Sequence, residues 1–91
     1  MAYNIKITKH FKKNVELCKR RGFPMPLLHT ALDILIETST LPSEYRPHRL
    51  SGNHEGKWEA HLKGDWLLIW EKHDDELLLI MLATGTHSDV F

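Results

Sequence analysis

Residues 58–82, WEAHLKGDWLLIWEKHDDELLLIML, carry the clearest secondary-structure pattern in the chain. Three strand-like runs lie within them: Trp58–Leu62, Trp66–Glu71 and Leu77–Leu82. The short polar stretches Lys63-Gly64 and Asp74-Asp75 separate these runs. Apolar runs of this length, joined by turns that contain glycine or aspartate, are typical of antiparallel strands. The segment therefore predicts three neighbouring strands joined by tight turns.

A short strand and a helix are expected before this region, at the N-terminus. The alternating apolar residues of the strand are Tyr3, Ile5 and Ile7. Thr8 can then cap a helix over residues 9–21, and Gly22 suits the position just past the end of that helix. The apolar face of the helix carries Phe11, Val15 and Cys18, with Leu17 close to it. Cys18 is therefore interpreted as a packing residue and not as a nucleophile.

A second helix and a long irregular connection follow. Because proline is tolerated in the first turn of a helix, this helix is expected to begin near residues 24–26 and to end near Thr38. Its inward side chains are expected to be Leu28, Leu32, Leu35 and Ile36. Residues 38–56 contain prolines and glycines and predict a long loop. The order β-α-α-β-β-β predicts a single α+β domain over residues 1–91, with two helices packed on a small, mostly antiparallel sheet.

Composition fits one small soluble domain. The 91 residues include 42% hydrophobic side chains and equal numbers of basic and acidic ones. No apolar run approaches the roughly 18 residues of a membrane span, and the start lacks the apolar segment of a secretory signal. One cysteine rules out an internal disulfide framework and fits a reducing cytosol. These features predict a cytoplasmic protein without a membrane anchor.

Charge is distributed unevenly along the chain. Residues 1–22 hold seven basic side chains and one acidic one, net +6, whereas residues 23–91 hold five basic and eleven acidic ones, net −6. A basic segment of this kind can bind a polyanion, or it can be a solvated helix face that binds nothing. The basic residues of the first predicted helix are Lys9, Lys12, Lys13, Lys19, Arg20 and Arg21.

Four residues on separate segments are candidates for acid–base chemistry. His48 lies in the long loop, His61 and Asp65 flank the first strand turn, and His87 follows the last strand. Imidazoles can donate and accept protons near neutral pH, but surface histidines that cap strand ends are the alternative. No two histidines have the i, i+4 spacing of helical metal ligands, and one cysteine cannot form a thiolate set, so no metal site is expected.

Aromatic residues allow either packing or base stacking. At least two of Trp58, Trp66 and Trp70 are expected to pack in the core. An exposed aromatic side chain near His61 could instead stack on a nucleobase. The last residue, Phe91, is expected either to pack back on the sheet or to stack on a ligand.

Three stretches together resemble a known family. They are YRPHRLSG at residues 45–52, EAHLKGDWLLIW at residues 59–70, and ATGTHSDVF at residues 83–91. At this spacing they resemble the YafQ-type mRNA interferase toxins of the RelE/ParE superfamily, and the resemblance extends over essentially the whole chain. It implies a RelE-like fold and a toxin of a bacterial type II toxin–antitoxin system. Such toxins enter the ribosomal A site and cut mRNA there, inhibiting translation.

The resemblance also implies which residues act. His48, His61, Asp65 and His87 would form the acid–base set, while Trp66 and Phe91 would shape the site. The hypothesis assigns His87 as the general acid, with His48, His61 or Asp65 supplying or orienting the base. Such cleavage needs no cofactor, because the neighbouring 2′-OH of the RNA serves as nucleophile.

Partners follow from the same resemblance. The basic first helix would contact ribosomal RNA through phosphates. A cognate antitoxin of the DinJ/RelB type would wrap and block the toxin. Operator DNA would be bound only through that complex, which typically represses the shared operon.

Position 83 departs from the family pattern. The residue before Thr-Gly-Thr-His is typically arginine, which can hold the scissile phosphate, and here it is Ala83. Losing one such donor commonly costs about 10²–10³ in rate. One explanation is an engineered replacement that weakens a toxin, and the size of the lost contribution favours it. The other is a natural, attenuated chain in which Lys63 or Arg49 supplies the charge.

Three functions therefore remain open. The leading one is a ribosome-dependent mRNA endoribonuclease, attenuated at Ala83. The alternative is a non-catalytic module that binds an antitoxin and acts in operon autoregulation. Cleavage of free RNA without ribosomes is disfavoured by the neutral total charge, because capture of free RNA needs more basic surface.

Overall fold

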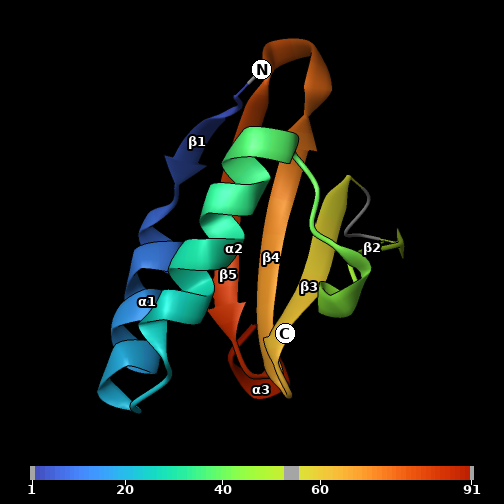
Figure 1. The fold of residues 1–91 in the computed structure, drawn as a ribbon. Coiled ribbons are helices and arrows are strands. Elements are labelled where there is room, and N and C mark those ends of the chain that lie inside the picture. Colours follow the sequence, from blue (N-terminus) through green and yellow to red (C-terminus); the bar gives the residue numbers. More distant parts are fainter. Residues whose placement is uncertain (1, 53–55, 91) are drawn as a thin grey trace.

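The computed structural model describes residues 2–52 and 56–90, which form a five-stranded sheet with the two longer helices on one face and the short C-terminal helix at one end (Figure 1). The elements are β1 (Asn4–Ile7), α1 (Lys9–Arg20), α2 (Met25–Thr38), the 3₁₀ turn η1 (Ser43–Tyr45), β2 (His48–Arg49), β3 (Lys57–Lys63), β4 (Trp66–His73), the 3₁₀ turn η3 (Asp74–Glu76), β5 (Leu78–Gly85) and α3 (His87–Val90). The sheet order is β1-β5-β4-β3-β2. β1 runs parallel to β5, and the other neighbours are antiparallel. The predicted α+β class and mostly antiparallel sheet are therefore confirmed.

Helix boundaries follow the predicted capping residues. The Thr8 hydroxyl accepts a hydrogen bond from the Phe11 amide at 3.0 Å and donates one to the Met81 carbonyl at 3.1 Å, so the cap also ties the start of α1 to β5. Gly22 follows α1 with a φ of 81°, which confirms its predicted position past the helix end. None of the helices in the two described ranges is long and apolar enough to cross a membrane.

The core lies between the helices and one face of the sheet. Its most buried large side chains include Phe11, Leu28, Leu35, Leu68, Trp70, Leu79 and Met81. Trp66 and Trp70 are 4% and 1% exposed, which confirms that at least two tryptophans are core residues. Trp58 is half-buried and stacks on Trp70 with ring centroids 6.4 Å apart. Cys18 is 1% exposed, so its packing interpretation is also confirmed.

Two segments predicted to be irregular contain regular structure. Residues 38–56 hold η1 and β2, and β2 forms because His48 pairs with Glu59 of β3, a contact that local sequence does not encode. The C-terminal tail was predicted to follow a strand ending at Leu82. Instead β5 continues to Gly85 and α3 follows it.

The buried face of α1 differs from the predicted one at one position. Asn14 is buried whereas Val15 is only half-buried, because the Asn14 side chain accepts a hydrogen bond from the Thr84 amide of β5.

The face of the sheet turned away from α1 and α2, here called the open face, carries the polar candidates. Side chains alternate between the two faces along each strand, and cross-strand partners share a face. Core residues and their cross-strand partners therefore point to the helices, and the residues next to them along each strand point to the open face. The open-face positions are Lys57, Glu59 and His61 on β3, Ile69 and Glu71 on β4, Ala83 on β5, and His48 on β2.

Candidate active site

β2 brings His48 directly beside Glu59. The imidazole Nε2 lies 3.2 Å from the Glu59 carboxylate, whose side chain is only 8% exposed. The other ring nitrogen, Nδ1, donates to the Arg46 carbonyl at 3.1 Å. His48 and Glu59 therefore form an ion pair when the imidazole is protonated. Glu59 was not among the predicted site residues, although it lies on the same strand face as His61.

His61 lies two residues further along the same face of β3. Its Nδ1 donates to the Gly64 carbonyl at 3.3 Å, in the turn between β3 and β4. That hydrogen bond places the proton of a neutral ring on Nδ1 and the lone pair on Nε2. His61 is therefore arranged to accept a proton.

His87 pairs with Asp65 at the end of the sheet, where α3 meets the β3–β4 turn. Nδ1 of His87 lies 2.8 Å from a carboxylate oxygen of Asp65, and the two side chains are 60% and 63% exposed. The carboxylate fixes the proton on Nδ1 and stabilises the ring when it is charged, so a proton given to a substrate comes from Nε2.

The four predicted acid–base residues thus fall into separate contacts. Asp65 contacts His87, His48 contacts Glu59, and His61 contacts the turn backbone. The aromatic candidate Phe91 lies outside the described residues.

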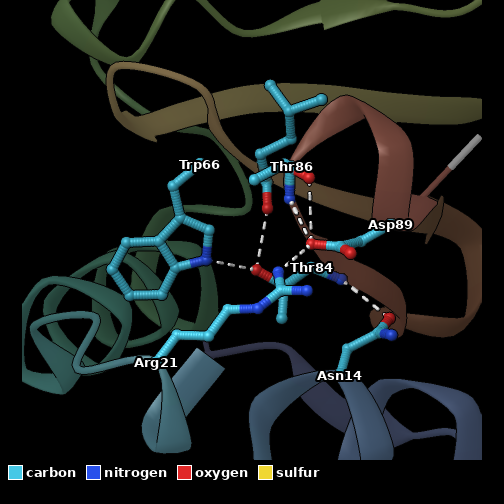
Figure 2. A network of polar contacts seen from close by, with 7 residues as sticks. Asn14, Arg21, Trp66, Thr84, Thr86 and Asp89 are labelled. Carbon is cyan, nitrogen blue, oxygen red and sulfur yellow. Dashed lines mark hydrogen bonds and ion pairs between the residues drawn. The ribbon is translucent and has the colours of Figure 1, made fainter. Parts of the chain in front are cut away.

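A hydrogen-bond network holds α3, and with it His87, against α1 (Figure 2). Asp89 accepts from the Thr86 amide at 2.9 Å, from the Thr86 hydroxyl at 3.0 Å and from Arg21 at 2.7 Å. The Arg21 guanidinium and the Thr86 hydrogen bonds hold the pKa of Asp89 below its ordinary value. None of these three residues was predicted to position the tail, because the sequence alone does not bring Arg21 to residue 89.

Gly85 makes this packing possible. Its φ is 145°, and a Cβ built there would lie 2.8 Å from Cβ of Asp89. Any larger residue would strain the backbone and push α3 away. The glycine therefore determines how closely the helix that bears His87 approaches the sheet.

A second, buried part of the network joins three elements beneath the tail (Figure 2). The Trp66 indole donates to the Thr84 hydroxyl at 2.9 Å, and that hydroxyl donates to the Leu67 carbonyl at 2.7 Å. The Thr84 amide donates to the Asn14 side chain at 3.1 Å. Because a buried polar group without a partner is costly, these bonds fix β4, β5 and α1 relative to one another.

Trp66 also borders a hollow beside the acid–base residues. The hollow has a volume of about 330 Å³, and its lining includes Phe23, Lys63, Asp65 and Trp66. The rings of Phe23 and Trp66 meet edge to face with centroids 5.1 Å apart. The hollow is mostly apolar beside an exposed carboxylate and an exposed lysine, as suits an aromatic, polar-edged ligand such as a nucleobase.

Ala83 lies on the open face, and the predicted substitute cations lie elsewhere. Arg49 pairs with Trp58 and stands over its ring at 5.4 Å, on the helix-covered face. Lys63 lines the hollow beside Trp66. The lysine that shares a hollow with Ala83 is Lys57.

The predicted ribosome-binding cations form an exposed basic surface along α1. The exposed side chains are Lys9, Lys12, Lys13, Lys19, Arg20 and Arg21. Arg21 differs from the others because its guanidinium is paired with Asp89. The remaining five cations are on the outside of the helix, where a polyanion can reach them.

Two other chemistries find little support in the described residues. Burial raises the pKa of the Cys18 thiol, which makes it a poor nucleophile. Within residues 2–52 and 56–90, no group of three or more His, Cys, Asp or Glu side chains is arranged to hold a metal ion. These residues therefore do not fit a metal centre built from three protein ligands.

Comparison with known proteins identifies the family. The pattern described as "Bacterial toxin of type II toxin-antitoxin system, YafQ" matches residues 3–91. The mRNA interferase toxin YafQ of Escherichia coli K12 is 35% identical over 89 residues, which cover 97% of this chain and 95% of that protein. This chain belongs to the YafQ family of bacterial type II toxin–antitoxin toxins.

Solved structures agree with this membership. The E. coli DinJ–YafQ toxin–antitoxin complex matches with a TM-score of 0.90 and 33% identity, over 100% of this chain and 99% of the matched chain. A metal-bound toxin from Helicobacter pylori matches with a TM-score of 0.88 and 31% identity over the full length of both chains. The RelE-like architecture expected from the sequence is therefore confirmed.

Proposed function

We propose that this chain is a toxin endoribonuclease that cuts mRNA in the ribosomal A site and so inhibits translation. Membership of the YafQ family supports the proposal, since the E. coli relative is named an mRNA interferase toxin. The observation that carries the chemistry is the 2.8 Å contact between Asp65 and Nδ1 of His87, which prepares the imidazole to deliver a proton from Nε2.

The proposed reaction is a transesterification. His61 removes the proton from a ribose 2′-OH, and the 2′ oxygen forms a bond to the adjacent phosphorus. The bond from phosphorus to the 5′ oxygen breaks, and that oxygen takes the proton of His87. The products are a 2′,3′-cyclic phosphate and a 5′-OH, and no redox partner is needed. His48, when protonated, would stabilise the charge that builds on the phosphate, with the Glu59 carboxylate beside it.

Substrate binding would use two surfaces. The hollow lined by Lys63 and Trp66, with Phe91, would receive nucleotides next to the acid–base residues. The exposed lysines of α1 and Arg20 would contact ribosomal RNA through phosphates, so binding to ribosomes would weaken steeply with salt.

An antitoxin completes the proposed system. The E. coli toxin has been crystallised in complex with DinJ, and a DinJ/RelB-like antitoxin is the partner proposed for this chain. The toxin would act in the cytoplasm, where ribosomes are found. It would reach operator DNA only as part of the toxin–antitoxin complex.

A second candidate is a non-catalytic module that holds an antitoxin and tunes operon repression. Ala83 favours this alternative, because a small apolar side chain supplies no charge to a scissile phosphate.

Primer extension on an mRNA in a purified bacterial translation reaction separates these functions. The proposal expects cuts that require ribosomes. Cuts in naked RNA would instead indicate a free ribonuclease. If ribosomes bind the chain but the mRNA stays intact, the binding module becomes the better account.

A further inference from the structure

A small basic hollow lies on the open face beside Ala83. Its volume is about 170 Å³, well below that of a drug-sized site, which is about 300–1,000 Å³. The lining residues are His10, Leu50, Lys57, Ile69, Leu82, Ala83 and Val90. Two of these side chains are basic, the others are apolar, and none is acidic. The small side chain of Ala83 leaves the space open.

In the part of the chain that the structure describes, the carboxylates that face Lys57 each contact a histidine. Glu71 is its cross-strand partner on β4, but Oε2 of Glu71 lies 3.1 Å from Nε2 of His73. Glu59 lies two residues along β3 and contacts His48 at 3.2 Å. Among the residues that the structure describes, Lys57 itself forms no ion pair. A half-buried lysine against apolar walls favours an anionic ligand, because a bound anion replaces lost hydration.

The hollow also borders the segments that carry the acid–base residues. Leu50 follows β2, which holds His48. Val90 lies on α3, which holds His87, and Lys57 lies on β3, which holds His61. An anion in this hollow would therefore lie beside the three segments that carry His48, His61 and His87.

We infer that Lys57, with His10 beside it, binds the phosphate of the RNA in the hollow next to Ala83. This inference rests on the proposed function and names the cation of the same site. An ammonium binds a phosphate as a point charge and needs no planar fork, so Lys57 can reach it from β3, across β4 from Ala83, while position 83 stays small. Lys57 thereby differs from Arg49, which stands over Trp58 on the other face.

A binding experiment tests the inference without requiring catalysis. The probe is the dinucleotide TpT, which lacks a 2′-OH and cannot be cut, titrated into the full chain and followed by amide NMR. The matched ligand is methylphosphonate TpT, which has the same shape without the charge. Wild-type protein should show phosphate-dependent shifts at Ala83 and Val90, and Lys57→Gln should weaken TpT binding at least five-fold. Lys72→Gln is the control variant, because Lys72 lies near Trp58 and Asp74 instead.

Cleavage supplies the second readout. Lys57→Gln should lower mRNA cutting about 10²-fold, as expected for the loss of one donor to a reacting phosphate. Adding Ala83→Arg to that variant should restore cutting, since an arginine there would reach the same hollow. Equal TpT binding by wild type and Lys57→Gln would overturn the inference. If wild type binds TpT through Lys57 but cuts no mRNA, the anion site stands and the proposed nuclease activity fails.

Discussion

Two histidine–carboxylate pairs lie in the proposed site, and they are built in different ways. His48 and Glu59 are direct partners on adjacent strands, and the Glu59 side chain is 8% exposed. His87 and Asp65 are both more than half exposed and lie on a four-residue helix and a strand turn. The sheet register therefore fixes the first pair, whereas the tail network must hold the second.

The two pairs also differ in how their positions are held. The Glu59 carboxylate is buried within β3, and its partner His48 lies on the edge strand β2 with a side chain that is 49% exposed. His87 projects into solvent from a short element that depends on Thr86, Asp89 and Arg21 for its position. The proposed acid, His87, is consequently the part of the proposed site most easily displaced by distant substitutions.

The largest effect is expected from His87→Ala. Removing a general acid commonly costs about 10²–10⁴ in rate, and the side chain is 60% exposed, so the fold should remain intact. Primer extension in a translation reaction measures the rate, and circular dichroism checks the fold. Unchanged cutting would remove His87 from the mechanism.

A smaller but still large effect is expected from Gly85→Ala. The new Cβ would meet Asp89 and force α3 outward, and a displacement of about 1 Å can cost roughly 10²-fold in rate. Gly52→Ala is the matched control, because Gly52 also has a positive φ but nothing within 4 Å of the added Cβ. If both variants cut equally well, the tail does not depend on close packing at Gly85.

Glu59→Gln should lower cutting about ten-fold, an effect within the range seen when a partner that orients an imidazole is removed. The amide keeps the shape of the side chain but cannot match the charge of the His48 imidazolium. Rates at several salt concentrations provide the measurement. Restoration by Glu59→Asp would indicate that the charge matters, and a wild-type rate in the glutamine variant would contradict the assignment.

Asp89→Asn should have the smallest effect and one that depends on pH. The pKa of Asp89 is lowered in the folded state from its ordinary value of 3.8. Its carboxylate therefore stabilises the fold fully at a pH above 3.8, and this contribution is lost as the pH falls through the folded-state pKa. The variant should therefore melt a few degrees below wild type at pH 7 and approach it at pH 3. Its cutting rate should also fall several-fold.

Asp74→Asn is a matched control for that variant. The hydrogen bond from Tyr3 lowers the pKa of Asp74 as well, but this carboxyl lies in η3, at the far end of β4 from Asp65. It should show similar pH-dependent melting with an unchanged cutting rate. Equal loss of cutting in both variants would mean that stability, and not the position of α3, limits activity.

Much of the fold could be predicted because its signals are local. Thr8 acts through capping, Gly22 through its left-handed backbone, and β3 to β5 through apolar runs of strand length between turns, all of which are readable along the chain. β2 and α3 could not be predicted, because they depend on pairing with β3 and on the ion pair from Arg21 to Asp89. Such contacts join residues that are far apart in sequence.

The site shows the same division. Resemblance to the family supplied His48, His61, Asp65 and His87, but not their partners. Glu59 looked like an ordinary strand residue, and only the register shows it beside His48. Lys57 became a candidate only when the hollow beside Ala83 was found. The sequence shows which side chains can carry a charge. It does not show which other side chain each of them contacts in the fold.

The most direct test of the account is cleavage of an mRNA that carries a single 2′-deoxynucleotide just before the mapped cut. The account rests on a 2′ oxygen activated by His61 and a 5′ oxygen protonated by His87. It therefore expects the all-RNA message to be cut on ribosomes, leaving a 5′-OH, and the substituted message to stay whole at that position. Cutting of both messages at the same bond would show a different nucleophile and contradict the account.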